Sequence, residues 1–125
     1  MTPEIPVLLL VGSDPPPRRA VAIALTRSFT VLTAPTLVEA TSTMRALRLD
    51  VVVADFELVD GSGVEVLARA QRYAPAAVRI LIAPAQYFVS ARDLCGAALL
   101  EPLDLATFGA RLARLVRKLG TRATT

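Results

Sequence analysis

The chain has 125 residues, 54% of them hydrophobic, and carries a formal net charge of +3. This length is typical of one compact domain, and the hydrophobic fraction is too high for a disordered chain. The sequence contains no histidine and one cysteine, which excludes the commonest general base, an internal disulfide and a metal site of several thiolates. We therefore expect one domain that is not an enzyme.

The N-terminus and the apolar runs exclude the common targeting and membrane signals. Residues 1–4 carry no basic region followed by an apolar stretch, so no signal peptide is predicted. Apolar runs such as Val7–Val11 and Val51–Ala54 fall far short of the ~20 residues that span a bilayer. We expect a cytoplasmic domain without a membrane partner, and the small net charge predicts no nucleic-acid partner by itself.

The start of the chain predicts a buried strand followed by a helix. Ile5–Val11 is a continuous apolar run, as expected for a strand that is covered on both faces. Three prolines follow, and they fit a helix only in its first turn, where amide hydrogens lack intrahelical partners. We predict a helix from about Pro15 to Ser28, capped by Ser13 or Asp14.

A second strand and helix come next. Phe29–Ala34 has the composition of a strand, and Thr36 and Glu39 have the spacing of a capping box. The helix that this box opens is predicted to run to about Leu49. Its inward-facing residues are predicted to be Leu37, Ala40, Met44 and Leu47.

The centre of the chain predicts the innermost strand of the sheet. Val51–Ala54 is fully apolar and stops at Asp55, and Glu57–Gly63 is predicted to be a loop. Ser62 and the glutamate three residues later form a second capping box, which opens a helix to about Tyr73.

The last third of the chain predicts two strands and two helices. Val78–Ala83 and Ala97–Leu100 are the strands, and Tyr87–Leu94 between them is a short helix. Asp104 caps a last helix whose apolar residues keep a 3.6-residue period to Leu119. Strands that alternate with helices predict an α/β domain, a single five-stranded parallel sheet with helices on both faces. We expect this domain to span residues 1–120, with 121–125 as a tail or the start of a linker.

In open parallel sheets, ligands bind beyond the carboxyl ends of the strands. The residues predicted there are Gly12, Ser13, Asp14, Asp55, Ala83 and Glu101. From Val7 to Leu119 the sequence resembles the receiver domains of bacterial response regulators, whose fold is a flavodoxin-like (βα)5 domain. The segments that carry the resemblance are Asp50–Asp55, Asp60–Gly63, Cys95–Ala97 and Glu101–Pro102.

The resemblance implies that Asp55 accepts a phosphoryl group from a histidine kinase, with Mg²⁺ held by an acidic pair after the first strand. Several positions depart from that pattern. The acidic pair maps onto Gly12 and Ser13, and Asp14 lies one position beyond it. The family's hydroxyl residue after the fourth strand, which binds the phosphoryl group, maps onto Ala83. The lysine of the family's Lys-Pro dipeptide maps onto Glu101.

These departures predict a degenerate receiver, or pseudo-receiver, which binds Mg²⁺ weakly or not at all and has no other cofactor. Mg²⁺ normally takes one or two carboxylates, and Glu101 brings a negative charge where a phosphate needs a cation. Two alternatives stay open. One is a working receiver that is phosphorylated on Asp55, with Asp14 or Glu101 helping to hold the metal, and that controls an output such as transcription. The other is a flavodoxin-like nucleotide or flavin binder, although the prolines after Asp14 remove amide donors that a phosphate needs.

The expected partners are proteins: a histidine kinase, an output domain or another regulator. In the family, the face made by the short helix before residues 97–100, that strand and the last helix forms homodimers or docks partners. In this chain the residues on that face are Ala98, which replaces the family's switch aromatic, Arg111, Arg114 and Lys118. A solvated basic helix face is the alternative interpretation.

Overall fold

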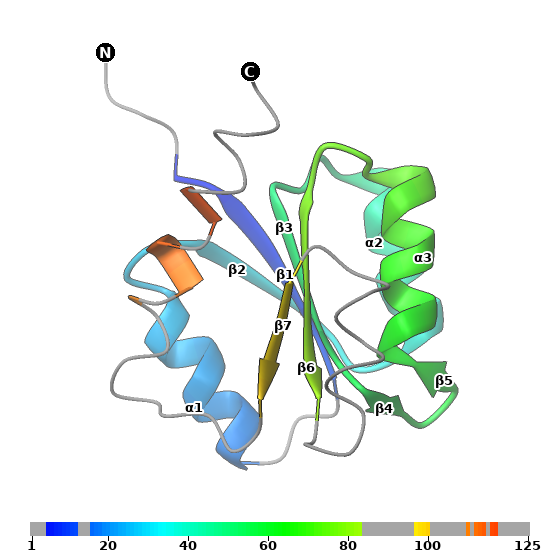
Figure 1. Cartoon of the computed structure of the whole chain (residues 1–125), viewed down its shortest axis with the longest axis horizontal. Helices are drawn as coiled ribbons and strands as arrows, with labels where there is room; N and C mark the ends of the chain where they lie inside the picture. The colour runs from blue at the N-terminus through cyan, green and yellow to red at the C-terminus, as the bar shows by residue number, and fades with distance from the viewer. Residues whose placement is uncertain are drawn as a thin grey trace.

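The structure, a computed structural model, describes residues 5–12, 16–83 and 97–100, together with residues 110, 112–114 and 116–117. Its main feature is a five-stranded sheet of order β2-β1-β3-β6-β7, in which every neighbouring pair is parallel (Figure 1). The strands are β1 (Val7–Val11), β2 (Thr30–Ala34), β3 (Val51–Asp55), β6 (Val78–Ala83) and β7 (Ala97–Leu100). The chain order reverses at β1, which is the flavodoxin-like arrangement. The predicted fold class is therefore confirmed.

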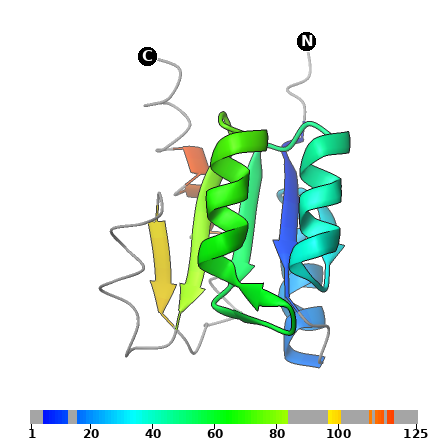
Figure 2. The ribbon, with the colours of Figure 1, turned by 90° about the vertical axis from the view of Figure 1, so that its right-hand side faces the viewer.

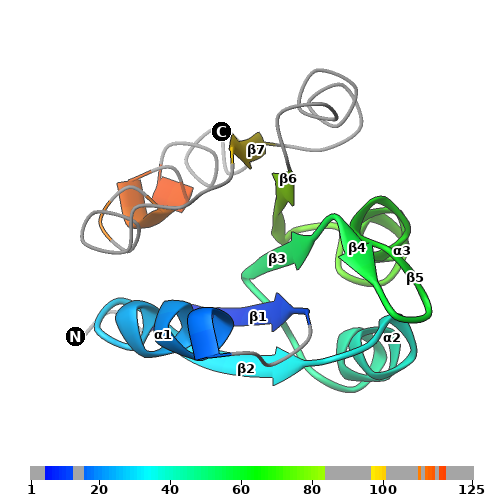
Figure 3. The same cartoon turned by 90° about the horizontal axis from the view of Figure 1, so that it is seen from below.

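Helices cover both faces of this sheet. α2 (Leu37–Ala46) and α3 (Gly63–Tyr73) lie side by side on one face (Figure 2). α1 (Pro16–Leu25) and the helical residues between 110 and 117 lie on the other face (Figure 3). Within the described residues, no helix is both long enough and apolar enough to cross a membrane.

Two hydrophobic cores result, because successive side chains of a strand point to opposite faces. Leu9, Val52 and Leu81 belong to the core beneath α2 and α3. Leu10 and Val53, which follow Leu9 and Val52 in sequence, belong to the core on the other face. That core also contains Leu25, Phe29 and Leu112. The continuous apolar strands of the sequence are explained by this double coverage.

Several expectations about the helices and loops are wrong, and others concern residues that the structure does not describe. Residues 57–63 are not only a loop, because β4 (Glu57–Leu58) and β5 (Gly61–Ser62) pair as a small antiparallel hairpin. The second helix ends at Ala46, and Leu47 is 51% exposed and does not point inward. Leu47 has extended backbone angles (φ −128°, ψ 149°), which break the helical period on which its inward position depended. The predicted helix 87–94 and the cap at Asp104 lie outside the described residues.

Candidate functional site

The candidate site lies at the carboxyl edge of the sheet. Val11 pairs with Ala54 at the ends of the adjacent strands β1 and β3, so Gly12 and Asp55 follow next to each other. Asp55 pairs with Ile82, and Ala83 ends β6 one residue further on. The predicted positions 12, 55 and 83 therefore meet at one edge, as the parallel topology requires.

Gly12 and Asp55 are in direct contact. A Cβ atom placed on Gly12 would lie 2.9 Å from Cγ of Asp55 and closer still to its Oδ2. The carboxylate of Asp55 thus fills the space in which a side chain of residue 12 would begin. The Gly12 amide donates to the carbonyl of Ala34 at 2.9 Å, which fixes the backbone on that side. At this contact the chain presents one carboxylate, and residue 12 contributes only backbone atoms.

The backbone around Asp55 is held from both sides. The Phe56 amide donates to the carbonyl of Ile82 at 3.0 Å, and the Gly63 amide donates to the carbonyl of Phe56 at 2.8 Å. A Cβ atom on Gly63 would collide with the main-chain carbonyl of Asp55. Helix α3 therefore begins in contact with the end of β3, and only a glycine allows this approach. The half-buried Asp55 side chain is positioned by this rigid backbone.

Asp60, in the turn between β4 and β5, caps a helix from another part of the chain. Its Oδ1 accepts from the Leu37 amide at 2.8 Å, and its Oδ2 accepts from the Val38 amide at 3.1 Å. Both amides belong to the first turn of α2, where amide hydrogens lack intrahelical partners. Thr36 completes the cap by accepting from the Glu39 amide at 3.1 Å. The loop after β3 is thereby tied to α2.

These contacts lower the pKa of the Asp60 carboxyl below 3.8. The Leu37 amide hydrogen bond is the largest cause, burial opposes it, and the Val38 amide and the charge of Arg69 add to the lowering. The pKa of Asp60 is lower in the folded state than in the unfolded state. The charged carboxylate therefore stabilises the fold fully at pH values above the unfolded-state pKa. This stabilisation is lost as the pH falls through the folded-state pKa.

We expect Asp60→Asn to lower the midpoint of thermal unfolding at neutral pH, because one amide of α2 loses its carboxylate acceptor. The difference from wild type should shrink as the pH falls below 3.8. Circular dichroism melts over a series of buffers measure both effects. The matched control is Glu57→Gln, a change at an exposed acid of the same hairpin, which should leave the midpoint unchanged. Equal losses at all pH values would contradict the carboxylate's role.

Other predicted positions are described in part or not at all. Ser13, Asp14 and Glu101 lie outside the described residues, as do Arg111 and Lys118. Ala98 pairs with Leu81 in β7, and Arg114 is exposed on the last helix. Among the residues that the structure places, no three histidine, cysteine, aspartate or glutamate side chains gather where a metal ion could bind.

No family model matches the chain, and neither does any curated protein. Solved structures do match. A response regulator receiver domain protein from Methanospirillum hungatei superposes with a TM-score of 0.82 at 16% identity, covering 95% of this chain and 99% of that one. The signal receiver domain of an HD domain-containing protein from Pseudomonas fluorescens gives 0.80 at 19% identity, covering 98% and 95%.

A third match is an adenylate cyclase from Rhodopirellula baltica, with a TM-score of 0.79 at 18% identity and 92% of each chain covered. All three identities are low, so the likeness concerns the arrangement of strands and helices. That arrangement is the strand order β2-β1-β3-β6-β7 with helices on both faces. The chain therefore has the fold of response-regulator receiver domains.

Proposed function

We propose that this chain is an atypical receiver domain of a response regulator, which signals through protein–protein contacts without Mg²⁺-dependent phosphorylation of Asp55. The observation that carries the proposal is the contact between Gly12 and the Asp55 carboxylate. Mg²⁺ requires near-octahedral oxygen ligands, normally including one or two carboxylates. Residue 12 offers only its backbone to such an ion, and the space in front of it is filled. At this contact the described residues offer such an ion a single carboxylate, that of Asp55, a ligand set for which we expect weak binding of Mg²⁺ or none.

The energetics of phosphoryl transfer support the same conclusion. Transfer depends on positioning and on neutralising the charge of the moving group. Losing one preorganised donor to a developing oxyanion typically costs about 3–4 kcal/mol. Ala83 has no hydroxyl, and Glu101 adds a negative charge at a position where the receiver pattern has a cation. These losses are not additive, but two of them together slow transfer by several orders of magnitude.

The second candidate is a conventional receiver that is phosphorylated on Asp55 and controls an output such as transcription. Asp55 favours it, since its half-buried side chain ends β3 at the edge where ligands bind in such sheets. In this candidate, Asp14 or Glu101 would supply the missing metal ligand.

In either candidate the domain is a cytoplasmic, non-enzymatic module whose partners are proteins: a histidine kinase, an output domain or another regulator. The surface proposed for such partners, or for a homodimer, includes Ala98 on β7 and the last helix with Arg111, Arg114 and Lys118. Its support is the exposure of Arg114 next to a helix turn that buries Leu112 against the sheet.

An NMR titration with Mg²⁺ and beryllofluoride, a phosphoryl analogue, separates the two candidates. For the atypical receiver we expect no saturable shifts of the Asp55, Gly12 and Ala83 amides at millimolar Mg²⁺. The Asp55→Asn variant is the control, because it removes the acceptor carboxylate at nearly constant volume. Saturable shifts in the wild type that disappear in Asp55→Asn would establish the conventional receiver instead.

A further inference from the structure

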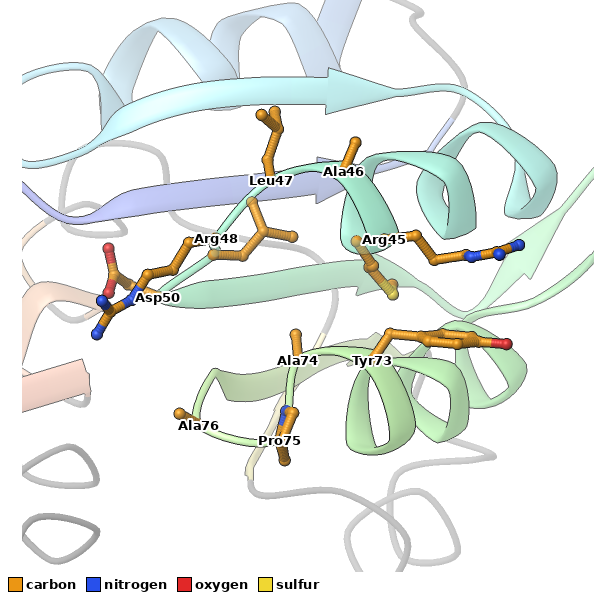
Figure 4. A pocket seen from close by; sticks show the side chains of 11 residues that line it. Arg45, Ala46, Leu47, Arg48, Asp50, Tyr73, Ala74, Pro75 and Ala76 are labelled. Carbon is orange, nitrogen blue, oxygen red and sulfur yellow. The ribbon is translucent and has the colours of Figure 1, made fainter.

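A groove opens at the amino edge of the sheet, the edge opposite Asp55. It has a volume of about 450 Å³ and lies between the C-terminal ends of α2 and α3 and the connections that lead from them to β3 and β6. Figure 4 shows Arg45 and Tyr73 at one end of this space and Arg48 and Asp50 at the other, with Ala74 pointing toward the end of α2 and Leu47 pointing away from Ala74.

The middle of the groove is apolar. Met44 and Leu49 form its floor and are 2% and 4% exposed. Leu47 stands above them with 51% of its surface exposed, because the chain leaves the helix at that residue. Pro75 lines the opposite wall. An exposed leucine beside a concave apolar floor can bury further area against a partner's side chain.

Two arginines, Arg45 and Arg48, and one acid, Asp50, line the groove, so its lining carries a net positive charge. The guanidinium carbon of Arg45 lies 5.7 Å from the centre of the Tyr73 ring, and that of Arg72 lies 5.3 Å from it, so the ring orients two cations at one end. At the other end, Arg48 lies together with Asp50. Within the described part of the chain, no acidic side chain forms an ion pair with these arginines. The acid of the lining, Asp50, accepts from the Val7 amide at 2.8 Å.

We propose that this groove binds an acidic segment of a partner protein, in which an apolar side chain is flanked by carboxylates. The apolar side chain would pack on Leu47 and the floor, and the carboxylates would pair with Arg45 and Arg48. Guanidinium groups bind carboxylates with two parallel hydrogen bonds, which suits this charge pattern. A groove of this volume accommodates a few side chains. The groove lies at the edge of the sheet opposite Asp55, so it shares no residue with the candidate phosphorylation site.

Binding of fluorescent peptides to the full chain, followed by anisotropy, tests this site. Each peptide carries one central leucine, isoleucine, phenylalanine or tryptophan flanked by glutamates. We expect at least one to bind saturably, and we expect Arg45→Glu and Arg48→Glu each to weaken it by about tenfold. Both arginines are exposed, so these variants should keep the circular dichroism spectrum of the wild type. Arg27→Glu, an exposed change in the turn between α1 and β2, should leave binding unchanged.

Further probes decide between an acidic peptide and other anions. Peptides with glutamine in place of glutamate, single-stranded oligothymidylate and phosphatidylglycerol vesicles should bind more weakly than the acidic peptides. The proposal is overturned if no acidic peptide binds, or if Arg27→Glu weakens binding as much as Arg48→Glu does. Preferential binding of the oligonucleotide or the vesicles through Arg45 and Arg48 would also overturn it, and would assign the groove to that ligand.

Discussion

Gly63→Ala is expected to lower the free energy of unfolding by about 3 kcal/mol, the upper part of the usual range for overpacking a core. The added methyl group would collide with the backbone carbonyl of Asp55 and would lie 2.6 Å from Cδ1 of Leu81. A carbonyl at the end of a central strand cannot move without disturbing the ladder between β3 and β6. Without this collision, alanine would stabilise the helical position by about 1 kcal/mol. The sign of the change in the free energy of unfolding therefore shows whether the collision exists.

Gly61→Ala is the matched control for this substitution. Its methyl group would lie 2.7 Å from Cδ2 of Leu37 and 3.3 Å from Oε1 of Glu65, both of which are ends of side chains and not backbone atoms. We expect a loss below about 1.5 kcal/mol. Urea unfolding measures both variants. If Gly63→Ala is as stable as the wild type, or if both variants lose the same free energy, helix α3 does not begin against the Asp55 carbonyl.

Leu81→Ala is expected to destabilise the domain by about 2–5 kcal/mol, the range for removing a buried leucine side chain. Leu81 is 0% exposed and lies in the core between β6 and the helices α2 and α3. Its cross-strand neighbour on β3 is Ala54, whose short side chain cannot fill the cavity. The loss should therefore lie above the low end of the range.

Urea unfolding of Val59→Ala provides the comparison, because Val59 is 88% exposed and its truncation should change stability by less than about 0.5 kcal/mol. The double variant Gly63→Ala/Leu81→Ala should be less destabilised than the sum of the two single variants, because one of the two collisions disappears. A loss below 1 kcal/mol for Leu81→Ala would show that the core beneath α3 collapses around the missing side chain.

The sheet and its two layers follow directly from sequence patterns. The continuous apolar runs at 51–54 and 80–82 lie in strands covered on both faces, as the absence of polar alternation indicates. The caps at Thr36 and Ser62 are also confirmed by hydrogen bonds from the amides of Glu39 and Glu65. They could be predicted because a hydroxyl residue three positions before a glutamate is typical of a helix start. Such features depend on neighbours in sequence, which is why they can be read without coordinates.

Contacts between distant segments could not be predicted in this way. Asp60 accepts from an amide 23 residues away, and nothing near Asp60 in sequence indicates that partner. The two-residue strands β4 and β5 are too short to show any periodicity. The groove at the amino edge depends on Leu47 leaving the helix, whereas the 3.6-residue period predicted that Leu47 points inward.

The sequence predicted where on the sheet the candidate site lies, but not how its side chains are arranged. Parallel topology brings residues 12 and 55 to one edge, so the sequence was sufficient to predict their proximity. That the Asp55 carboxylate lies against the Gly12 backbone depends on a side-chain rotamer, which sequence patterns do not determine. The roles of Ser13, Asp14 and Glu101 stay predictions.

The Gly12–Asp55 contact also restricts which residues position 12 can accept. A mutation to aspartate would have to displace the existing carboxylate and would place two like charges together before any cation compensates them. A Gly12→Asp substitution is therefore unfavourable by itself, and it becomes tolerable only alongside a second change that supplies positive charge.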